Sequence, residues 1–198
     1  MSATPHSISE TKDHPIDPAN FTEIVEQYQK PVFNLCARML GDEVEAEDAA
    51  QETFWKAYKN IKSYDPDRPF LTWLLSIAAH YCIDQIRKRK FGSVSMDAMP
   101  DDFIPDMEIL PEHAATQSEE QTRIRELLTT LAPEDRSAVV MRYWYDYSDE
   151  EIGKLLHLTV SAVKSRLFRA RKQMAQEWLK KNNKTLLPNR RTHEPSAV

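Results

Sequence analysis

The chain has 198 residues, which is long enough for one or two domains. A composition of 41% hydrophobic and 29% charged residues is typical of a globular protein with a packed core. No apolar run approaches the roughly 18 residues of a membrane-spanning helix, and the N-terminus lacks the basic start and apolar segment of a secretion signal. We therefore expect a cytoplasmic protein without membrane insertion.

The residue inventory gives no support for an enzyme. Cys36 and Cys82 each lie in an apolar helical pattern, which indicates buried free thiols rather than a disulfide. The six histidines show no metal-ligand spacing, and three glycines are too few for a glycine-rich phosphate loop. We expect no catalytic residue, cofactor or metal.

Charge is unevenly distributed along the chain. The net charge is −5, but Lys and Arg concentrate at 87–90 and 164–172, whereas Asp and Glu concentrate at 42–52 and 97–120. For binding a charged partner, the distribution of charge along the chain matters more than the net charge. The segregation predicts at least two partners of opposite charge.

The first part of the chain predicts a disordered tail and two helices. Residues 1–19 are polar, with prolines and no periodicity. An apolar helical stripe follows from Phe21 to Met39, with Pro31 expected to kink it and Gly41 to end it. The next helical stretch opens at 42–52 with six acids, which are Asp42, Glu43, Glu45, Glu47, Asp48 and Glu52. The helix dipole explains some of them, and a basic partner is an equally weighted explanation for the rest.

A turn-rich loop at 63–69 precedes a third predicted helix, Phe70–Lys90. One side of this helix is apolar, and the other carries Trp73 and His80 ahead of the basic run 87–90. Aromatic side chains beside cations can stack unpaired bases. On the residues alone, an extra core Trp and a basic last turn favoured by the dipole are the preferred explanation.

Residues 93–118 predict a flexible linker, because they hold acids and three prolines but no Lys or Arg. Helical spacing resumes at 119–131, and Pro133 followed by two acids predicts another helix start. Residues 182–198 predict a polar tail. The chain thus divides into two helical units.

The segment Ser148–Lys172 predicts a helix-turn-helix. Ser148 and Glu151 have the spacing of a capping box, His157 falls in the turn where a positive φ is expected, and Thr159 or Ser161 can cap the second helix. That helix carries five cations and no acid between residues 160 and 172. The pattern favours a DNA-recognition helix over a solvated basic surface helix.

Because an α-helix turns by about 100° per residue, the side chains of this second helix fall on two opposite faces. One is an apolar stripe made of Val163, Leu167, Ala170 and Met174. The opposite face carries Ser161, Ser165, Phe168, Arg169 and Lys172, with Lys164 flanking it.

Four segments carry a family resemblance: DAAQETFWKAY at 48–58, FLTWLLSIAAHYCIDQIRKRK at 70–90, LAPEDRSAVVMRYW at 131–144 and YSDEEIGKLLHLTVSAVKSRLFRARKQM at 147–174. Together they resemble a bacterial RNA polymerase sigma factor of the sigma-70 family, in the extracytoplasmic-function (ECF) group. The resemblance implies an all-α protein with two small helical domains joined by the flexible acidic linker, region 2 at 20–92 and region 4 at 119–181. Its implied partners are RNA polymerase core, through the β and β′ subunits, promoter DNA, and an anti-sigma protein as a further candidate.

The resemblance also implies site residues. The residues implied to bind core polymerase are Asp48, Gln51, Glu52 and Trp55. Recognition of the −10 element falls on Tyr64, Trp73, His80, Arg87, Lys88, Arg89 and Lys90, with the 63–69 loop similar to one that holds a flipped base. Recognition of the −35 element falls on Ser161, Lys164, Ser165, Phe168, Arg169 and Lys172.

Three positions depart from the family pattern. His80 stands where Asn is usual, Ser161-Ala162 replaces a frequent Gly-Thr, and His157 replaces a frequent turn Gly. Two rival functions remain open, an autonomous helix-turn-helix regulator and a helical adaptor that binds proteins only. The first would need a dimer to read two half-sites, and the second leaves the cationic blocks unexplained.

Overall fold

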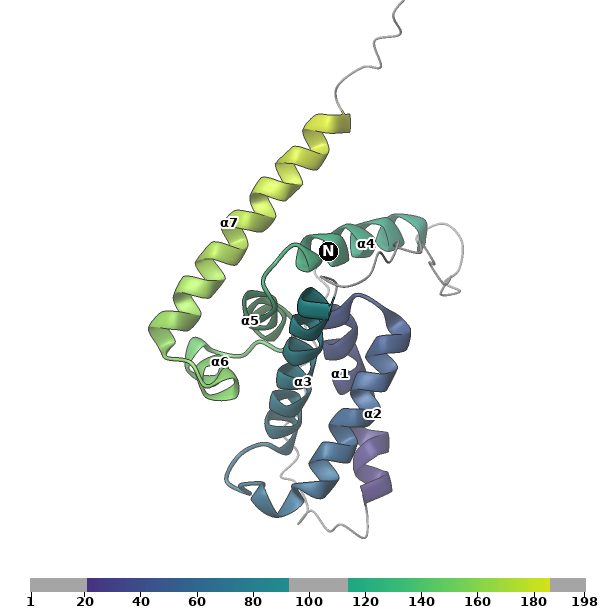
Figure 1. The fold of residues 1–198 in the computed structure, drawn as a ribbon, viewed down its shortest axis with the longest axis vertical. Coiled ribbons are helices and arrows are strands. Elements are labelled where there is room, and N and C mark those ends of the chain that lie inside the picture. Colours follow the sequence, from purple (N-terminus) through teal and green to yellow (C-terminus); the bar gives the residue numbers. More distant parts are fainter. Residues whose placement is uncertain (1–20, 93–113, 186–198) are drawn as a thin grey trace, which may run out of the picture.

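The computed structural model describes residues 21–92 and 114–185 (Figure 1). Within these ranges every regular element is a helix: α1 Phe21–Leu40, α2 Glu43–Lys59, the short 3₁₀ helix η2 Ile61–Ser63, α3 Phe70–Gly92, α4 Ala114–Thr129, α5 Pro133–Trp144, α6 Asp149–Leu156 and α7 Val160–Thr185. The predicted all-α fold is confirmed. The predicted N-terminal tail lies outside the described residues, as do most of the predicted linker and of the C-terminal tail.

The first three helices form an N-terminal unit in which α1 packs against both α2 and α3. Gly41 ends α1 with a φ of +81°, a conformation that favours glycine because it lacks a Cβ. Asp42 then caps α2 by accepting a hydrogen bond from the N–H of Glu45 at 2.8 Å. The first predicted helix continues through Pro31 to Leu40.

Helices α4 to α7 form a C-terminal unit that contains the predicted helix-turn-helix in α6 and α7. The capping box is present, because Ser148 N–H donates to Glu151 Oε2 at 2.7 Å and Glu151 N–H donates to Ser148 Oγ at 3.2 Å. His157 follows α6 with a φ of +55°, as predicted for the turn. Gly153 lets the turn pass closely over α6, since a Cβ there would lie 2.8 Å from the carbonyl oxygen of Leu158.

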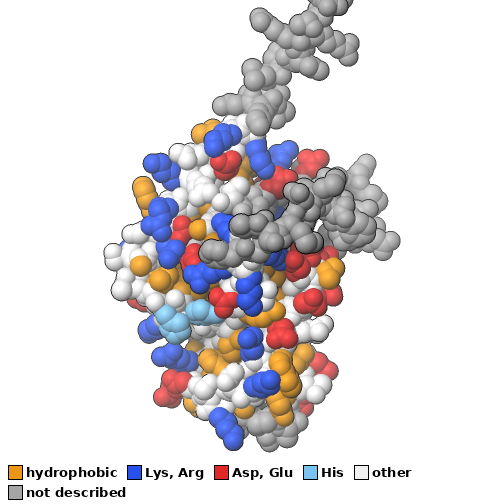
Figure 2. Space-filling model, in the orientation of Figure 1, with side chains coloured by type: hydrophobic (Ala, Val, Ile, Leu, Met, Phe, Trp, Pro, Cys, Tyr) orange, Lys and Arg blue, Asp and Glu red, His pale blue; other side chains and the backbone are white. Residues whose placement is uncertain are grey.

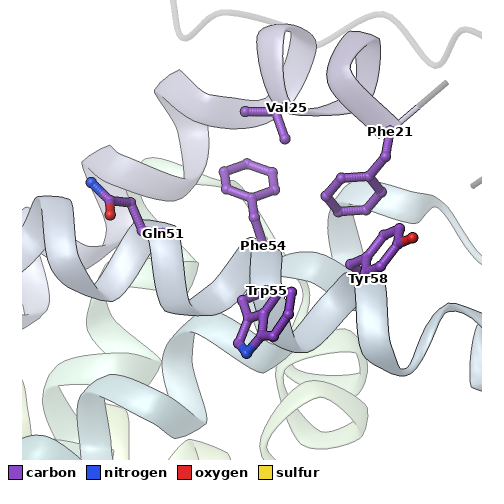
Figure 3. Close-up of a pocket in the computed structure, with 6 residues that line it drawn as sticks. All are labelled: Phe21, Val25, Gln51, Phe54, Trp55 and Tyr58. Atoms are coloured by element: carbon purple, nitrogen blue, oxygen red, sulfur yellow. The ribbon is translucent and has the colours of Figure 1, made fainter. Parts of the chain in front are cut away.

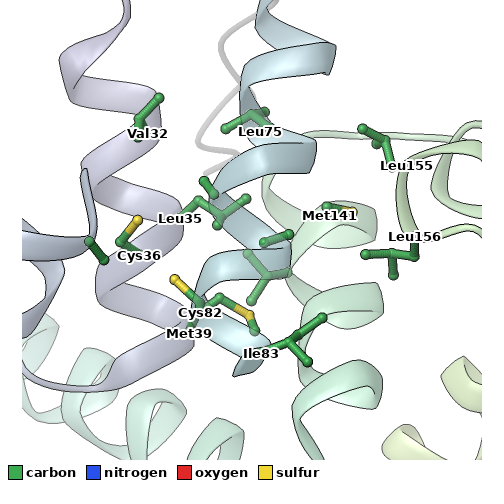
Figure 4. Packing of buried hydrophobic residues seen from close by; sticks show 14 of the residues in the cluster. Val32, Leu35, Cys36, Met39, Leu75, Cys82, Ile83, Met141, Leu155 and Leu156 are labelled. Atoms are coloured by element: carbon green, nitrogen blue, oxygen red, sulfur yellow. The ribbon is translucent and has the colours of Figure 1, made fainter. Parts of the chain in front are cut away.

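The two units share one hydrophobic core. Buried side chains from α1, α3, α5 and α6 meet in a single cluster (Figure 4). The side chains drawn in that view include Val32 and Leu35 of α1, Leu75 and Ile83 of α3, Met141 of α5, and Leu155 and Leu156 of α6. The helical units that the sequence predicts on either side of a linker are therefore packed against each other.

Polar groups also join the units. Arg136 of α5 is only 5% exposed and donates to the backbone carbonyl of Met39 at the end of α1. Tyr145, just after α5, donates its hydroxyl hydrogen to the carbonyl of Pro31 at 2.6 Å. Because both acceptors lie on α1, these bonds fix α5 against the N-terminal unit in one orientation.

Two helices extend beyond the domain limits that the sequence predicts. Helix α4 begins at Ala114, inside the predicted 93–118 linker, and α7 extends to Thr185, beyond the predicted limit of 181. Ala114 and Ala115 are strong helix formers that a charge-based linker boundary overlooks. None of the described helices is long and apolar enough to cross a membrane.

Candidate polymerase and nucleic-acid interfaces

The outer face of α7 carries every side chain predicted to contact the −35 element. Ser161, Lys164, Ser165, Phe168, Arg169 and Lys172 are all exposed, whereas Val163, Leu167 and Ala170 are buried and Met174 is half-buried. Thr159 is the residue that caps the helix, accepting from the Ala162 N–H at 3.2 Å. Phe168 is 64% exposed among cations, so its position is not explained by core packing. The assignment of the two faces is confirmed.

An acidic side chain on α5 holds part of this helix in place. Asp135 is buried and accepts from Arg166 Nη1 at 2.7 Å, and Arg169 Nη2 lies 3.4 Å from the same oxygen. Arg166 is thus one of the five cations of α7 but points to α5 rather than outward. No signal in the sequence pattern indicates this role, because a cation count does not distinguish a structural arginine from a DNA-binding one.

Helix α2 presents the predicted polymerase-binding residues on one exposed surface, here called the α2 surface. It consists of Asp48, Gln51, Glu52 and Trp55, all of them exposed. Trp55 is 52% exposed and Lys59 Nζ lies 4.3 Å from the centroid of its ring. An exposed indole next to two carboxylates can bind a partner surface that combines apolar and basic side chains.

An apolar hollow adjoins the α2 surface. Its volume is about 410 Å³ and its lining comes from α1 and α2, namely Phe21, Val25, Gln51, Phe54, Trp55 and Tyr58 (Figure 3). Phe21 contacts both Phe54 and Tyr58 edge to face, at ring-centroid distances of 6.5 and 5.1 Å. The aromatic side chains therefore extend the apolar part of the surface toward the start of α1.

The side chains predicted to recognise the −10 element do not gather at one place. Tyr64 and Trp73 lie together, with Tyr64 5.1 Å from Phe70 and 5.4 Å from Trp73 between ring centroids. Tyr64 also donates to the carbonyl of Arg68 at 2.6 Å, which ties the aromatic cluster to the predicted flipped-base loop. This group lies at the start of α3, far along the helix from the basic run.

The basic run 87–90 does not form one surface. Arg87 pairs with Glu134 of α5, and Arg89 pairs with Glu45 of α2. Lys88 and Lys90 are exposed at the end of α3. The run as read from the sequence is therefore divided between two neighbouring helices.

The C-terminal unit covers part of the α3 side that is predicted to face the −10 element. His80 lies with its ring centroid 5.3 Å from that of His157, and its Nδ1 lies 2.8 Å from the carbonyl of Ser76. Ser76 Oγ donates to the carbonyl of Leu155 at 2.9 Å, and Thr72 Oγ1 lies 3.0 Å from the Tyr147 hydroxyl oxygen. These contacts follow one side of α3 for several turns.

The Arg87–Glu134 pair shifts the titration of the carboxylate. Burial alone would raise the pKa of Glu134, but hydrogen bonding to its own backbone and the charges of Arg87 and Arg166 outweigh burial, so the pKa lies below its ordinary value. Glu134 is consequently ionised at neutral pH. It occupies a guanidinium that a DNA phosphate could otherwise bind.

The surface charge follows the segregation seen in the sequence. In the view of Figure 2, basic side chains are prominent along α7, and acidic side chains gather on the opposite flank, beside α2.

In the described ranges, no group of three or more His, Cys, Asp or Glu is placed to hold a metal. Cys36 and Cys82 are both buried free thiols, as predicted. Their mutual hydrogen bond, together with burial, raises the pKa of Cys82, which disfavours thiolate chemistry.

Comparison with known proteins assigns the family. The model of Sigma-70 region 2 matches residues 24–91, and the model of Sigma-70, region 4, matches residues 121–174. The chain is 37% identical over 166 residues to the ECF RNA polymerase sigma factor SigW of Bacillus subtilis, an alignment that covers 79% of this chain and 88% of SigW. This chain belongs to the ECF sigma factors. The predicted site residues of this sigma factor all lie inside the two matched ranges.

Two further proteins resemble this sigma factor. The ECF RNA polymerase sigma factor SigE of Mycolicibacterium smegmatis is 32% identical over 168 residues, which is 84% of this chain and 64% of SigE. The fold is similar to that of the sigma factor RpoE from Bartonella quintana, solved in complex with the anti-sigma factor NepR, with a TM-score of 0.63. That similarity covers 81% of this chain and 97% of RpoE at 24% identity, and supports the fold alone.

Proposed function

We propose that this sigma factor binds RNA polymerase core and directs promoter-specific initiation of transcription by recognising −10 and −35 elements. Membership of the ECF family is the observation that carries the proposal. The two oppositely charged surfaces support it, because a promoter-recognition subunit has to bind both a protein and DNA. Its place of action is the cytoplasm, where the polymerase transcribes, and promoter selection requires no catalysis by the chain itself.

The α2 surface is the proposed contact with core polymerase. Its carboxylates are exposed, and its indole adjoins an apolar hollow. A buried aromatic anchor with a charged rim is a common arrangement in protein interfaces. Both the β and β′ subunits are candidate partners, with the basic partner surface on β′ facing the α2 surface.

The proposed DNA contacts lie on both units. The exposed face of α7 has the geometry of a recognition helix that enters the major groove at the −35 element. Tyr64 and Trp73 supply aromatic surfaces, and His80 with residues 87–90 supplies polar and cationic groups, for the −10 element. An anti-sigma factor is a further proposed partner. By covering either surface, it would block these contacts.

Reconstitution with core polymerase tests the function. We expect the chain to be inactive alone and to direct transcription from a subset of a promoter library once core is added. Footprints at both the −35 and −10 elements should appear only with core. Sequence-specific binding by a dimer without core would instead identify an autonomous helix-turn-helix regulator, and binding to core with no promoter selection would identify an adaptor.

A further inference from the structure

A second hollow lies between α2 and α3, next to the α2 surface, and is here called the α2–α3 hollow. Its volume is about 560 Å³, and it is lined by Asp48, Gln51, Glu52 and Trp55 of α2 together with Tyr81 of α3. The four α2 residues are those proposed to bind core polymerase. Tyr81 is half-buried, and the sequence pattern assigns no function to it. Its side chain extends the α2 surface onto the neighbouring helix.

Each of the two aromatic rings in the α2–α3 hollow already carries a cation. Lys56 Nζ lies 5.5 Å from the centroid of the Tyr81 ring, and Lys59 Nζ lies 4.3 Å from that of Trp55. A cation above an aromatic ring is attracted by the negative charge on the face of the ring. Both lysines are exposed, so the rings they cover can also be reached by a cationic side chain of a partner.

The two carboxylates of the hollow add negative charge beside these rings. Among the described residues, no Lys or Arg forms an ion pair with Asp48 or Glu52. Both carboxylates lie close enough to act on Tyr81. Burial is the main cause that raises the pKa of the Tyr81 hydroxyl, and the charges of Glu52 and Asp48 add to it, against an opposing hydrogen bond from Gln85.

An arginine side chain suits such a site better than a lysine does. The guanidinium group is planar, so that one face can stack on an aromatic ring while its N–H groups donate to a carboxylate. An ammonium group is more strongly hydrated and has no flat face. The combination of aromatic rings and carboxylates in one hollow therefore favours arginine as the occupant.

We propose that the α2–α3 hollow receives an arginine side chain of core polymerase, with Tyr81 as an additional contact residue, and that Lys56 competes with this arginine for the Tyr81 ring. In the free chain Lys56 lies over the ring. When core binds, the guanidinium stacks on the ring and donates to Asp48 or Glu52, while Lys56 moves into solvent. The proposal rests on the proposed contact of core polymerase with the α2 surface, and adds to it a residue of α3 and an internal competitor.

Two substitutions of Tyr81 test the role of its ring in holoenzyme formation. Tyr81→Leu removes the aromatic face and keeps an apolar side chain, and is expected to weaken core binding roughly three- to ten-fold. Tyr81→Phe keeps the ring and should bind core within about two-fold of the wild type. Circular dichroism shows whether both chains are folded. Equal losses of affinity in the two variants, or no loss in a folded Tyr81→Leu chain, overturns the contact.

Lys56→Met removes the competing cation and keeps an apolar stem. It is expected to tighten core binding roughly two- to five-fold. Lys30→Met, the matched control at an exposed position of α1, should bind core as the wild type does. In combination with Tyr81→Leu the gain should vanish, because no ring is left to compete for. No gain with Lys56→Met, or a gain that persists in the double variant, overturns the competition.

Two free amino-acid derivatives test the choice of arginine. At equal concentration, arginine amide should weaken core binding by the wild type more than lysine amide does, and the two should act equally on Tyr81→Leu. Equal effects on the wild type would overturn the assignment of arginine.

Failure of the proposed function would look different. A wild-type chain that does not bind core contradicts that function. If Asp48→Lys with Glu52→Lys weakens core binding but Tyr81→Leu does not, the α2 surface is retained as the contact and only the role of Tyr81 is wrong.

Discussion

At the scale of single residues, two nearby side chains on α7 are expected to have different roles, one in stability and the other in DNA recognition. Leu167 is buried inside the C-terminal unit, whereas Arg169 is exposed with one nitrogen near Asp135. Leu167→Ala is expected to lower the free energy of unfolding by about 2–5 kcal/mol, because it leaves a cavity in a packed core. Arg169→Ala is expected to weaken promoter binding by about 1–3 kcal/mol with little change in stability, because it removes a base or phosphate contact.

Urea unfolding and a holoenzyme–promoter binding assay measure the two effects. Arg171→Ala is the matched control, since Arg171 is exposed on α7 outside the proposed contact set. If Leu167→Ala impaired only binding and Arg169→Ala only stability, the two faces would have been assigned to the wrong roles.

Single residues also mark where sequence reasoning ends. The capping pair Ser148 and Glu151 and the turn residue His157 were predictable, because each depends on chemistry within a few positions of the chain. The roles of Arg136 and Arg166 were not, because their acceptors come from distant segments. No periodicity or spacing encodes which arginine of a basic helix will point inward.

At the scale of elements, the turn between α6 and α7 tolerates no side chain at Gly153. A Cβ there would lie 2.8 Å from the carbonyl oxygen of Leu158, a backbone atom that cannot rotate away. Gly153→Ala is therefore expected to destabilise the chain by about 1–3 kcal/mol, despite the better helix propensity of alanine. Chemical denaturation measures it, and a gain in stability would mean that the turn lies farther from α6.

Helix α2 carries a prediction about partner binding. Charge reversal with Asp48→Lys and Glu52→Lys is expected to weaken core polymerase binding by roughly ten-fold or more, because like charges then face each other across the interface. Helicity should be retained, since both side chains are exposed.

Competition between variant and wild-type chains for core measures this effect. Glu43→Lys with Glu47→Lys is the control, with the same charge change at exposed positions of α2 outside the proposed surface. Equal loss of affinity in both variants would indicate a general electrostatic effect rather than a defined contact.

The elements themselves were largely predictable, whereas their association was not. Apolar periodicity located α1, α3 and both helices of the helix-turn-helix, because each buries a face that the sequence displays at helical spacing. The start of α5 was predicted instead from Pro133 and the two acids that follow it. Glu134 illustrates the opposite case: its sequence position indicates a helix start, and its pairing with Arg87 appears only in the folded chain. The division of the basic run 87–90 between α5 and α2 has the same origin.

At the scale of the whole molecule, the contact between units predicts a dependence on alkaline pH. Burial raises the pKa of Tyr145, whose hydroxyl donates to the Pro31 carbonyl. A raised folded-state pKa gives stability that is fully present below the unfolded pKa of about 10 and is lost as pH rises through the folded value. The stability difference between wild type and Tyr145→Phe should accordingly shrink above about pH 10.

Thermal unfolding of both chains from mildly to strongly alkaline pH, on either side of the ordinary tyrosine pKa, measures this difference. Comparing the two chains removes the contributions of other groups that titrate in the same range. A difference that stayed constant, or grew, with rising pH would mean that Tyr145 is ionised at least as readily in the folded chain as in the unfolded one.

The core that runs through α1, α3, α5 and α6 also affects cooperativity. Two units joined only by a linker would melt independently, each with its own transition. Here some apolar side chains are excluded from water only because both units are present. Loss of either unit would therefore expose apolar surface of the other unit to water. The free chain should therefore give a single calorimetric transition, whose heat capacity change includes the apolar area between the units. Either unit produced alone should melt at a lower temperature than it does within the intact protein.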